Sequence, residues 1–381
     1  MASATQVKAS VLNGIRDLRL QDRDLAAPAS DEIQVAVQST GLCGSDLHYY
    51  NHYRNGDIIV REPLTLGHES SGTVVSVGSN VAPSSFAPGD RVALEVGVPC
   101  EECEYCLKGR YNICRSMRFR SSAKAFPHFQ GTLQERINHP AKWCHKLPPS
   151  ISLDLGALIE PLSVAMHARD RANLPADSTV LVFGAGAVGL LAGAVCKAAG
   201  AKTVVIADIQ KDRVDFAVAN GFADAAVVVP MGRPQTIEDK LEYAQTVADS
   251  IKATKVNGEP VGELTAVYEC TGVETCLQAS IYSAKPGGKI MIIGMGTPIL
   301  TLPMSAAALR EVDLVGVFRY ANTYAPAIKM LSDPPAALPD LTKLVTQRFK
   351  GMDKIHDAFT TAGQVKDHDG KLVIKVVVDM S

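Results

Sequence analysis

The sequence predicts an α/β protein in which a β-rich domain accompanies a doubly wound parallel sheet. Residues 178–208 have the pattern strand, glycine turn, helix, strand and acid, whereas residues 1–155 hold short apolar or alternating runs separated by glycine and proline turns. A chain of 381 residues also suffices for two domains with sizeable cores. We expect residues 1–159 and 319–381 to form the β-rich domain, and residues 160–318 to form the parallel-sheet domain.

The glycine turn at residues 184–189 carries the first functional prediction. The apolar run before it is short enough for a buried strand, and the Ala- and Leu-rich run after it predicts a helix that stops before Gly200. Gly184 permits a sharp turn, Gly186 lets a pyrophosphate approach the backbone, and Gly189 lets the helix pack on the strand. The free N–H groups of the helix N-terminus suit phosphates. This context predicts a dinucleotide site.

Asp208 ends the second apolar run and decides between the two common dinucleotides. A carboxylate there accepts hydrogen bonds from the ribose hydroxyls and repels a 2′-phosphate, so we predict NAD rather than NADP. An ordinary glycine-rich turn is one alternative, although a lone turn would lack the flanking strands and the acid. A membrane span is another, because residues 178–196 carry no charge; their glycine density argues against it.

Composition narrows the class of protein. Charged residues make up 20% and apolar residues 46%, as in globular proteins, and the net charge of −2 gives no electrostatic case for nucleic acid or an anionic membrane. Residues 1–10 are polar and lack the apolar segment of a secretory signal, so we expect a cytoplasmic location. The nine cysteines are then expected to be metal ligands and buried thiols.

Four of these cysteines follow the spacing C-x2-C-x2-C-x7-C, which is typical of a closed structural zinc site. Lys108 and Gly109 within the loop argue against a cluster of buried thiols, and two disulfides are the other alternative. The predicted ligands are Cys100, Cys103, Cys106 and Cys114.

A second metal site is indicated by Cys43 and by the pair His68 and Glu69. A lone cysteine is usually a small buried apolar residue. Cysteine, histidine and carboxylate together, however, form a mixed soft and hard ligand set that suits zinc.

The run Gly67-His68-Glu69-x2-Gly72-x5-Gly78-x2-Val81 resembles the zinc signature of the medium-chain dehydrogenases. The resemblance covers nearly the whole chain, including Gly89-Asp90-Arg91-Val92 and the glycine turn. It implies a GroES-like catalytic domain and a Rossmann NAD-binding domain. It also implies two zinc ions, a catalytic one and a structural one in the four-cysteine lobe.

Glu160 refines this resemblance. It follows the apolar run 156–159, where an unpaired carboxylate would be costly, and a metal partner removes that cost. Simple zinc alcohol dehydrogenases have a cysteine at this place, whereas Glu-Pro-Leu-Ser-Val at 160–164 resembles the polyol dehydrogenases, the sorbitol, xylitol and L-arabinitol group. A carboxylate implies a harder zinc that favours oxygen-rich substrates. Whether Glu69 or Glu160 binds zinc directly or through water stays open.

The same resemblance implies further roles. Glu160 would accept the substrate proton through bound water, with Ser45 and His48 as a relay to solvent. Tyr49, Arg319 and Tyr320, with Glu160, would contact the substrate, although packing for Tyr49 and a structural ion pair for Arg319 are alternatives. For Arg213 the alternative is a surface arginine. The cofactor residues would be Gly184, Gly186, Val188, Gly189, Asp208, Arg213, Ile293, Gly294, Met295, Val317, Phe318 and Arg319.

We therefore predict an NAD-dependent zinc polyol dehydrogenase that oxidises a secondary hydroxyl of a sugar alcohol to a ketose. Sorbitol to fructose is favoured, with xylitol or L-arabinitol as rivals. The alternatives are a general secondary-alcohol dehydrogenase and a non-catalytic NAD-binding scaffold. We expect a homo-oligomer, a tetramer by the resemblance, with a polyol or ketose as its small-molecule partner. Residues 231–262 resemble a polar insertion with a helical core, to which we assign no chemistry.

Overall fold

The computed structural model describes residues 5–381, and these fold into two compact units. The β-rich unit comprises Met1–Glu160, Ala321–Asp333 and Thr342–Ser381, of which the structure describes Thr5 onward. The parallel-sheet unit comprises Pro161–Tyr320 and Pro334–Leu341. The chain thus enters the parallel-sheet unit, returns, and contributes one more short segment to it.

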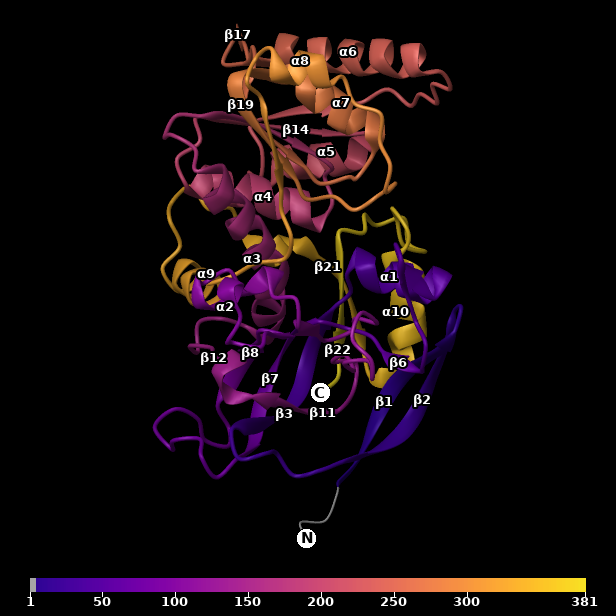
Figure 1. Cartoon of the computed structure of the whole chain (residues 1–381), viewed down its shortest axis with the longest axis vertical. Helices are drawn as coiled ribbons and strands as arrows, with labels where there is room; N and C mark the ends of the chain where they lie inside the picture. Colours follow the sequence, from indigo (N-terminus) through magenta and orange to yellow (C-terminus); the bar gives the residue numbers. More distant parts are fainter. Residues whose placement is uncertain (1–4) are drawn as a thin grey trace. The chain divides into compact units, whose positions relative to one another are not determined.

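The β-rich unit is built around a seven-stranded sheet with the order β12-β8-β7-β3-β22-β21, in which β11 also pairs with β3 (Figure 1). All its pairings are antiparallel except that of β21 with β22. A second sheet has the order β2-β1-β6. The strands are β1 (Thr5–Gly14), β2 (Asp17–Leu25), β3 (Glu32–Gly41), β6 (Leu64–Thr65), β7 (Glu69–Val77), β8 (Arg91–Leu94), β11 (Arg136–Pro140), β12 (Cys144–Lys146), β21 (Val345–Lys350) and β22 (Lys375–Asp379).

Helices cover parts of this unit and close its core. Buried side chains of α1 (Gly44–His52) and α10 (Ile355–Ala362) pack together with strand residues, including Tyr50, Phe359 and Val378. The smaller elements are β4 (Arg54–Asn55), β5 (Ile58–Ile59), β9 (Gly97–Val98), β10 (Arg118–Phe119), α2 (Glu104–Leu107), α9 (Tyr324–Ser332) and the 3₁₀ turns Tyr111–Ile113, Ala141–Trp143, Leu341–Leu344 and Met352–Lys354.

The parallel-sheet unit has six strands in the order β15-β14-β13-β18-β19-β20, which is 3-2-1-4-5-6 along the chain and defines the doubly wound dinucleotide-binding fold. Every pairing in this sheet is parallel. The predicted combination of a β-rich domain with a doubly wound parallel sheet is therefore confirmed. The strands are β13 (Thr179–Phe183), β14 (Thr203–Asp208), β15 (Ala225–Val228), β18 (Leu264–Glu269), β19 (Ala284–Ile292) and β20 (Asp313–Gly316).

Helices α4 (Ala187–Ala198), α5 (Lys211–Ala219), α6 (Ile237–Ala253), α7 (Glu274–Ser283) and α8 (Met304–Ala308) belong to this unit, and α3 (Leu153–Ala172) leads into it. The predicted polar insertion contains α6, which packs beside α7 (Figure 1). Its residues Ala244, Val247 and Ile251 are buried in the same core as β13 and β14. The segment therefore contributes to the core as well as to the surface, because its polar residues occupy only the outer face of α6.

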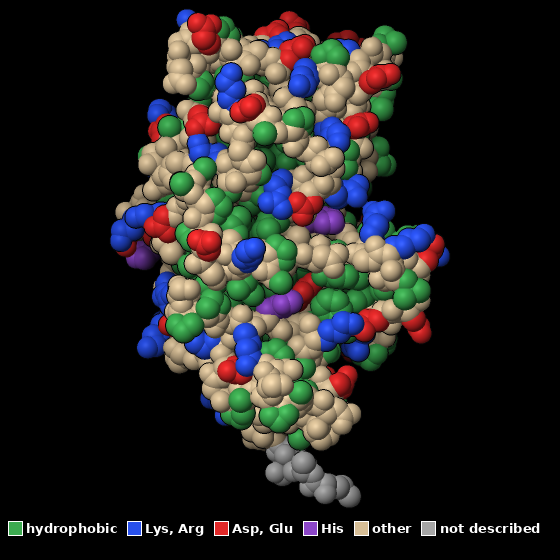
Figure 2. Space-filling view, turned by 90° about the vertical axis from the view of Figure 1, so that its left-hand side faces the viewer, with side chains coloured by type: hydrophobic (Ala, Val, Ile, Leu, Met, Phe, Trp, Pro, Cys, Tyr) green, Lys and Arg blue, Asp and Glu red, His purple; other side chains and the backbone are tan. Residues whose placement is uncertain are grey.

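Charged side chains of both signs are interspersed over the face shown in Figure 2, in keeping with the net charge of −2. Among residues 5–381, no helix is both long enough and apolar enough to cross a bilayer.

Candidate metal centres and cofactor site

The four cysteines of the lobe converge as their spacing predicts. All four sulfur atoms lie within 4.8 Å of one another. The separations are 3.5 Å for Cys103–Cys106, 3.5 Å for Cys100–Cys114 and 4.0 Å for Cys100–Cys106. Tetrahedral zinc with bonds of about 2.3 Å places its sulfurs ~3.8 Å apart, so the lobe fits this metal. All four are free cysteines, which excludes the disulfide alternative for this structure.

The thiols differ in how readily they ionise. Hydrogen bonds, the largest from the backbone N–H of Cys106, lower the pKa of Cys103 to about 7. Burial raises the pKa of Cys106 and of Cys114 above the ordinary thiol value. Without a cation these sulfurs compete for protons, and a divalent metal removes the competition by binding thiolates.

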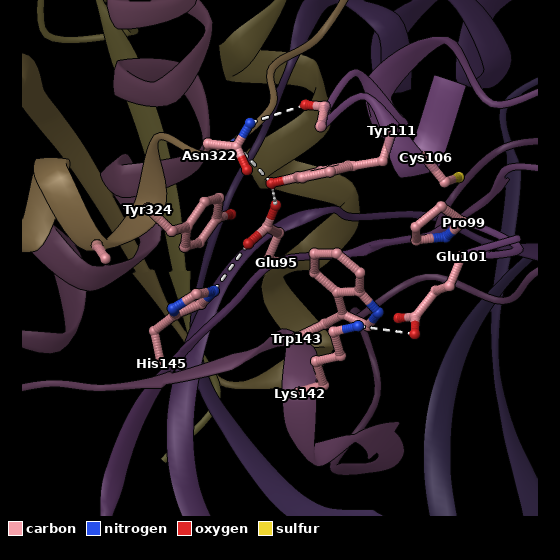
Figure 3. A pocket seen from close by; sticks show the side chains of 12 residues that line it. Glu95, Pro99, Glu101, Cys106, Tyr111, Lys142, Trp143, His145, Asn322 and Tyr324 are labelled. Carbon is pink, nitrogen blue, oxygen red and sulfur yellow. Dashed lines mark hydrogen bonds and ion pairs between the residues drawn. The ribbon is translucent and has the colours of Figure 1, made fainter. Parts of the chain in front are cut away.

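A buried carboxylate anchors the lobe to the sheet (Figure 3). Glu95 follows β8 and is 2% exposed. It accepts a hydrogen bond of 2.6 Å from the Tyr111 hydroxyl and lies 2.8 Å from Nε2 of His145. The backbone N–H of Asn322 donates to the same hydroxyl at 2.7 Å, and its side chain donates to the Gly109 carbonyl. This network ties the cysteine loop to three distant segments of the β-rich unit.

A second group of metal-ligating side chains lies inside the β-rich unit. Ligand atoms of Cys43, His68 and Glu69 lie within 4.8 Å of one another. Cys43 is the N-cap of α1, whereas Glu69 is the first residue of β7 and follows His68 directly. His68 and Glu69 are buried, and Cys43 is half-buried. The structure therefore brings together three residues that the sequence proposed for one site.

Asp46 holds this group in place. Its Oδ1 accepts hydrogen bonds from Ser121 Oγ at 2.6 Å and from the Gly67 N–H at 3.1 Å, and lies 3.2 Å from Nδ1 of His68. Its Oδ2 accepts the Cys43 N–H at 3.3 Å. A carboxylate on Nδ1 fixes the imidazole and leaves Nε2 to a metal, which is the usual support for a metal-binding histidine. Burial alone would raise the pKa of Asp46, but His68 and these donors lower it.

Lys375 of β22 forms an ion pair with Glu69. Its Nζ lies 2.8 Å from Oε1 and 2.7 Å from Oε2, and it also donates to the Leu42 carbonyl at 3.0 Å. Burial lowers the pKa of Lys375, but Glu69 and Cys43 raise it by more, so the ammonium is retained. Glu160 adds to this rise, so its carboxylate acts on the same buried neighbourhood.

Glu160 occupies the middle of α3 and is 5% exposed. Its carboxylate is not among the atoms that lie within 4.8 Å of one another in the Cys43 group. The donor chemistry of the Cys43 group fits zinc, since it offers a soft thiolate, an oriented imidazole and hard carboxylate oxygen. The direct role of Glu160 stays a prediction.

The remaining predicted residues of this unit lie on α1. Ser45 is half-buried and His48 is exposed. Tyr49 is only 3% exposed, sits in the core, and its hydroxyl accepts the Ala123 N–H at 3.2 Å. This favours the packing alternative for Tyr49 over substrate contact.

The glycine turn of the parallel-sheet unit has the required geometry. Gly184 has φ +94°, and a Cβ on Gly189 would lie 1.8 Å from the Gly184 carbonyl oxygen, so both positions need glycine. Gly186 caps α4 without a side-chain hydrogen bond, which leaves the first N–H groups to a ligand. Val188 is half-buried in the first turn of α4, and a Cβ on Gly186 would lie 3.8 Å from Arg213.

Asp208 ends β14 beside this turn. Its Oδ2 accepts the Ala185 N–H at 2.7 Å, and its Oδ1 accepts the Gln210 N–H at 2.8 Å. These bonds aim the carboxylate along the carboxyl edge of the sheet, where ligands of such folds bind.

The segments after β19 and β20 lie at the same edge. Ile293 and Gly294 donate their N–H groups to the Glu269 carbonyl, and Val317 donates to that of Ile292. A Cβ on Gly294 would lie 2.1 Å from the Gly272 nitrogen, so only glycine fits there. Four further predicted residues belong to these segments. Met295 and Phe318 are exposed, and Tyr320 is buried. The Arg319 guanidinium lies 4.8 Å from the Phe318 ring centroid, and Arg319 has φ +51°.

Comparisons with known proteins agree with this geometry. Residues 29–149 match the alcohol dehydrogenase GroES-like domain, and residues 187–333 match the zinc-binding dehydrogenase domain. Sorbitol dehydrogenase of Gallus gallus is 39% identical over 361 residues, covering 95% of this chain and 94% of the relative. That of Bos taurus is 41% identical over 352 residues, covering 92% of each.

The chain belongs to the zinc-binding alcohol dehydrogenase family. Among solved structures, L-idonate 5-dehydrogenase of Escherichia coli matches this zinc-binding dehydrogenase with a TM-score of 0.82 and 25% identity, covering 99% of both chains.

Sequence reasoning missed the supporting residues of this zinc-binding dehydrogenase. Asp46 lies three positions after Cys43, and an acid at that distance from a metal ligand was a usable signal. Lys375 lies between Ile374 and Val376, and a lysine inside such an apolar run indicates a buried partner. Glu95 carried no comparable signal, because its partners Tyr111, His145 and Asn322 come from separate segments.

Proposed function

We propose that this chain oxidises a secondary hydroxyl of a sugar alcohol to a ketose with NAD as the hydride acceptor, sorbitol to fructose ahead of xylitol or L-arabinitol. The observation that carries the proposal is the group of Cys43, His68 and Glu69, whose ligand atoms lie within 4.8 Å of one another. The charge of Glu160 raises the pKa of Lys375 beside this group. The chain is also about 40% identical to sorbitol dehydrogenases. A non-catalytic scaffold would not need these ligands together with their buried support.

Cys43 and His68 would hold the catalytic zinc, with the carboxylates of Glu69 and Glu160 as further ligands or as partners through water. Zinc in such a site lowers the pKa of a hydroxyl and stabilises a developing alkoxide. Asp46 keeps His68 in the tautomer that leaves Nε2 available. The four cysteines of the lobe would hold a structural zinc.

The proton and the hydride leave by different routes. Glu160 is the proposed proton acceptor, with Ser45 and His48 passing the proton to solvent. Although His48 is exposed, partial desolvation of its ring and the neighbouring His52 lower its pKa, which favours the neutral imidazole that can accept a proton. NAD bound at the parallel sheet would accept the hydride of the carbinol carbon, so that loss of the proton and the hydride would leave the ketose carbonyl.

Substrate contacts to the remaining hydroxyls are proposed for Arg319 and Tyr320. Polar groups that pair with hydroxyls penalise substrates that lack them. Sorbitol and xylitol should therefore have a kcat/KM far above that of 2-propanol, measured by NADH absorbance over a panel of alcohols. Equal efficiency on 2-propanol would favour the alternative, a general secondary-alcohol dehydrogenase.

The cofactor is proposed to bind at the carboxyl edge of the parallel sheet, over the glycine turn and Asp208. The carboxylate would repel the 2′-phosphate of NADP, so NAD should be preferred by about 10- to 100-fold in kcat/KM. The double variant Asp208→Ser with Ile209→Arg removes the repulsion and adds a planar cation, and should move the preference toward NADP. An unchanged preference would show that Asp208 does not face the ribose.

A cytoplasmic homotetramer completes the proposal. Free cysteines at every one of the nine positions suit a reducing compartment. Light scattering coupled to size-exclusion chromatography would test the tetramer, with a monomer as the contradicting result.

A further inference from the structure

The side chain of Glu69 crosses a neighbouring strand to reach its partner. Strands β7, β3 and β22 are adjacent, and Glu69 pairs in register with Gly41, which pairs with Val377. A Cβ placed on Gly41 would lie 2.3 Å from Oε2 and 3.3 Å from Cβ of Glu69. The carboxylate thus occupies the space that any other residue at position 41 would fill, and this brings it to Lys375.

Lys375 uses its donors on both sides of the metal-ligand group. An ammonium has three N–H donors, and its Nζ contacts both oxygens of Glu69 and the carbonyl of Leu42. Leu42 immediately precedes Cys43 in the chain. One cation therefore contacts a proposed carboxylate ligand and the peptide that leads into the proposed thiolate ligand.

Burial strengthens the electrostatic interaction between Lys375 and Glu69. The side chains of Lys375 and Glu69 are 4% and 1% exposed. A pair in such surroundings is weakly screened, and removal of one partner leaves an uncompensated buried charge, unlike the loss of an exposed pair.

We propose that Lys375 is a positioning residue that aims the Glu69 carboxylate at the metal site of Cys43 and His68 and offsets its charge there. The inference rests on the proposed function for the identity of that site. It assigns to Lys375 no contact with the metal or the substrate. Ligating carboxylates depend on such hydrogen-bonded partners, whose loss costs about 10- to 100-fold in metal affinity.

Zinc retention tests this role without any substrate. The variants are Lys375→Met, which keeps the stem, and Lys375→Arg, which keeps a cation. Lys289→Met is the matched control, because Lys289 is half-buried and its Nζ donates to a carbonyl, that of Ala172, rather than to a carboxylate. Zinc loss to a chelator and the absorption of Co²⁺ in the Cys43 site are followed in the full-length protein.

Lys375→Met should bind the Cys43-site zinc about 10- to 100-fold more weakly and shift the Co²⁺ spectrum, while the cysteine lobe keeps its metal. Lys375→Arg should restore part of the affinity, and Lys289→Met should match the wild type. Unchanged or tighter zinc binding in Lys375→Met overturns the inference, as does equal loss from both sites. If Lys375→Met shows this selective loss but the zinc-loaded wild-type protein fails to oxidise sorbitol, the inference stands and the proposed function is refuted.

Gly41→Ala is a second variant that tests the same inference if Lys375→Met does not fold. Its methyl group would displace the Glu69 carboxylate while leaving Lys375 in place. The same selective loss of zinc and the same direction of spectral shift support the inference. A Gly41→Ala protein with wild-type zinc affinity and spectrum contradicts it.

Discussion

The two candidate metal centres are built in opposite ways. The cysteine lobe takes all its ligands from residues 100–114, and most of its sulfur atoms belong to half-buried side chains. The Cys43 group takes its ligands from two separate segments, and its support comes from Asp46, Ser121 and Lys375. The lobe is organised along the chain, and the Cys43 group across the sheet.

This difference separates structural from catalytic demands. A closed site needs four similar ligands, which a short loop supplies by spacing alone. A reactive site needs ligands of different hardness held at defined orientations, and the surrounding carboxylates and cations set that orientation and the local charge. We therefore expect damage to the Cys43 group to remove chemistry, and damage to the lobe to remove stability.

The largest effect should follow from Cys43→Ala. Loss of the thiolate should abolish sorbitol oxidation and lower the zinc content from about two ions per chain to about one. The unfolding temperature should change little, since the lobe keeps its metal. Cys196→Ala, at a buried cysteine of the parallel-sheet unit, is the control. Wild-type turnover by the Cys43 variant would refute the zinc mechanism.

Cys103→Ser should reverse that pattern. The lobe should lose its zinc, so the free energy of zinc binding would no longer stabilise the fold. We expect the unfolding temperature to fall by about 5–10 °C, which corresponds to ~2–3 kcal/mol at 2–4 °C per kcal/mol. Protein that remains folded should keep most of its kcat. Thermal unfolding and initial rates measure both, and a lost kcat with an unchanged melting temperature would make the lobe catalytic.

The anchor of the lobe should respond to acid through His139. This buried imidazole lies 3.0 Å from the Glu95 carbonyl and accepts from Arg120, and burial, then Arg120, lowers its pKa to about 3. The unfolded state binds the proton between that value and about 6.5, so stability falls as the pH falls through this window.

The slope should be roughly 1.4 kcal/mol per pH unit within the window, measured by urea unfolding between pH 7 and pH 4. His139→Gln, which cannot titrate, should have a correspondingly flatter slope. Parallel slopes for the two proteins would mean that His139 is not the group responsible.

The smallest effect should come from Tyr49→Phe. The variant loses the acceptor for the Ala123 N–H, which should cost ~1 kcal/mol of stability. Because the hydroxyl lies in the core, kcat/KM for sorbitol should stay within about threefold. A fall beyond tenfold at unchanged stability would return Tyr49 to the substrate and extend the catalytic site along α1.

Local spacing explains how much of this architecture could be predicted from sequence. Gly184, Gly189 and Asp208 lie within one strand–turn–helix–strand unit, so their roles follow from residues close in the chain. Asp46 could have been noticed beside Cys43. Lys375 could not be paired in advance, because it lies 306 positions after Glu69 and the sheet order alone brings the two together.

The position of Lys375 near the end of the chain sets the order in which the two proposed metal sites can be completed during synthesis. The cysteine lobe has its last ligand once Cys114 is made, whereas Lys375 comes 375 − 114 = 261 residues later. At about 5–20 residues per second, the ribosome needs roughly 10–50 s to cover that interval. A nascent chain therefore holds all four proposed ligands of the structural zinc before the counter-ion of Glu69 exists, so the lobe can be completed first.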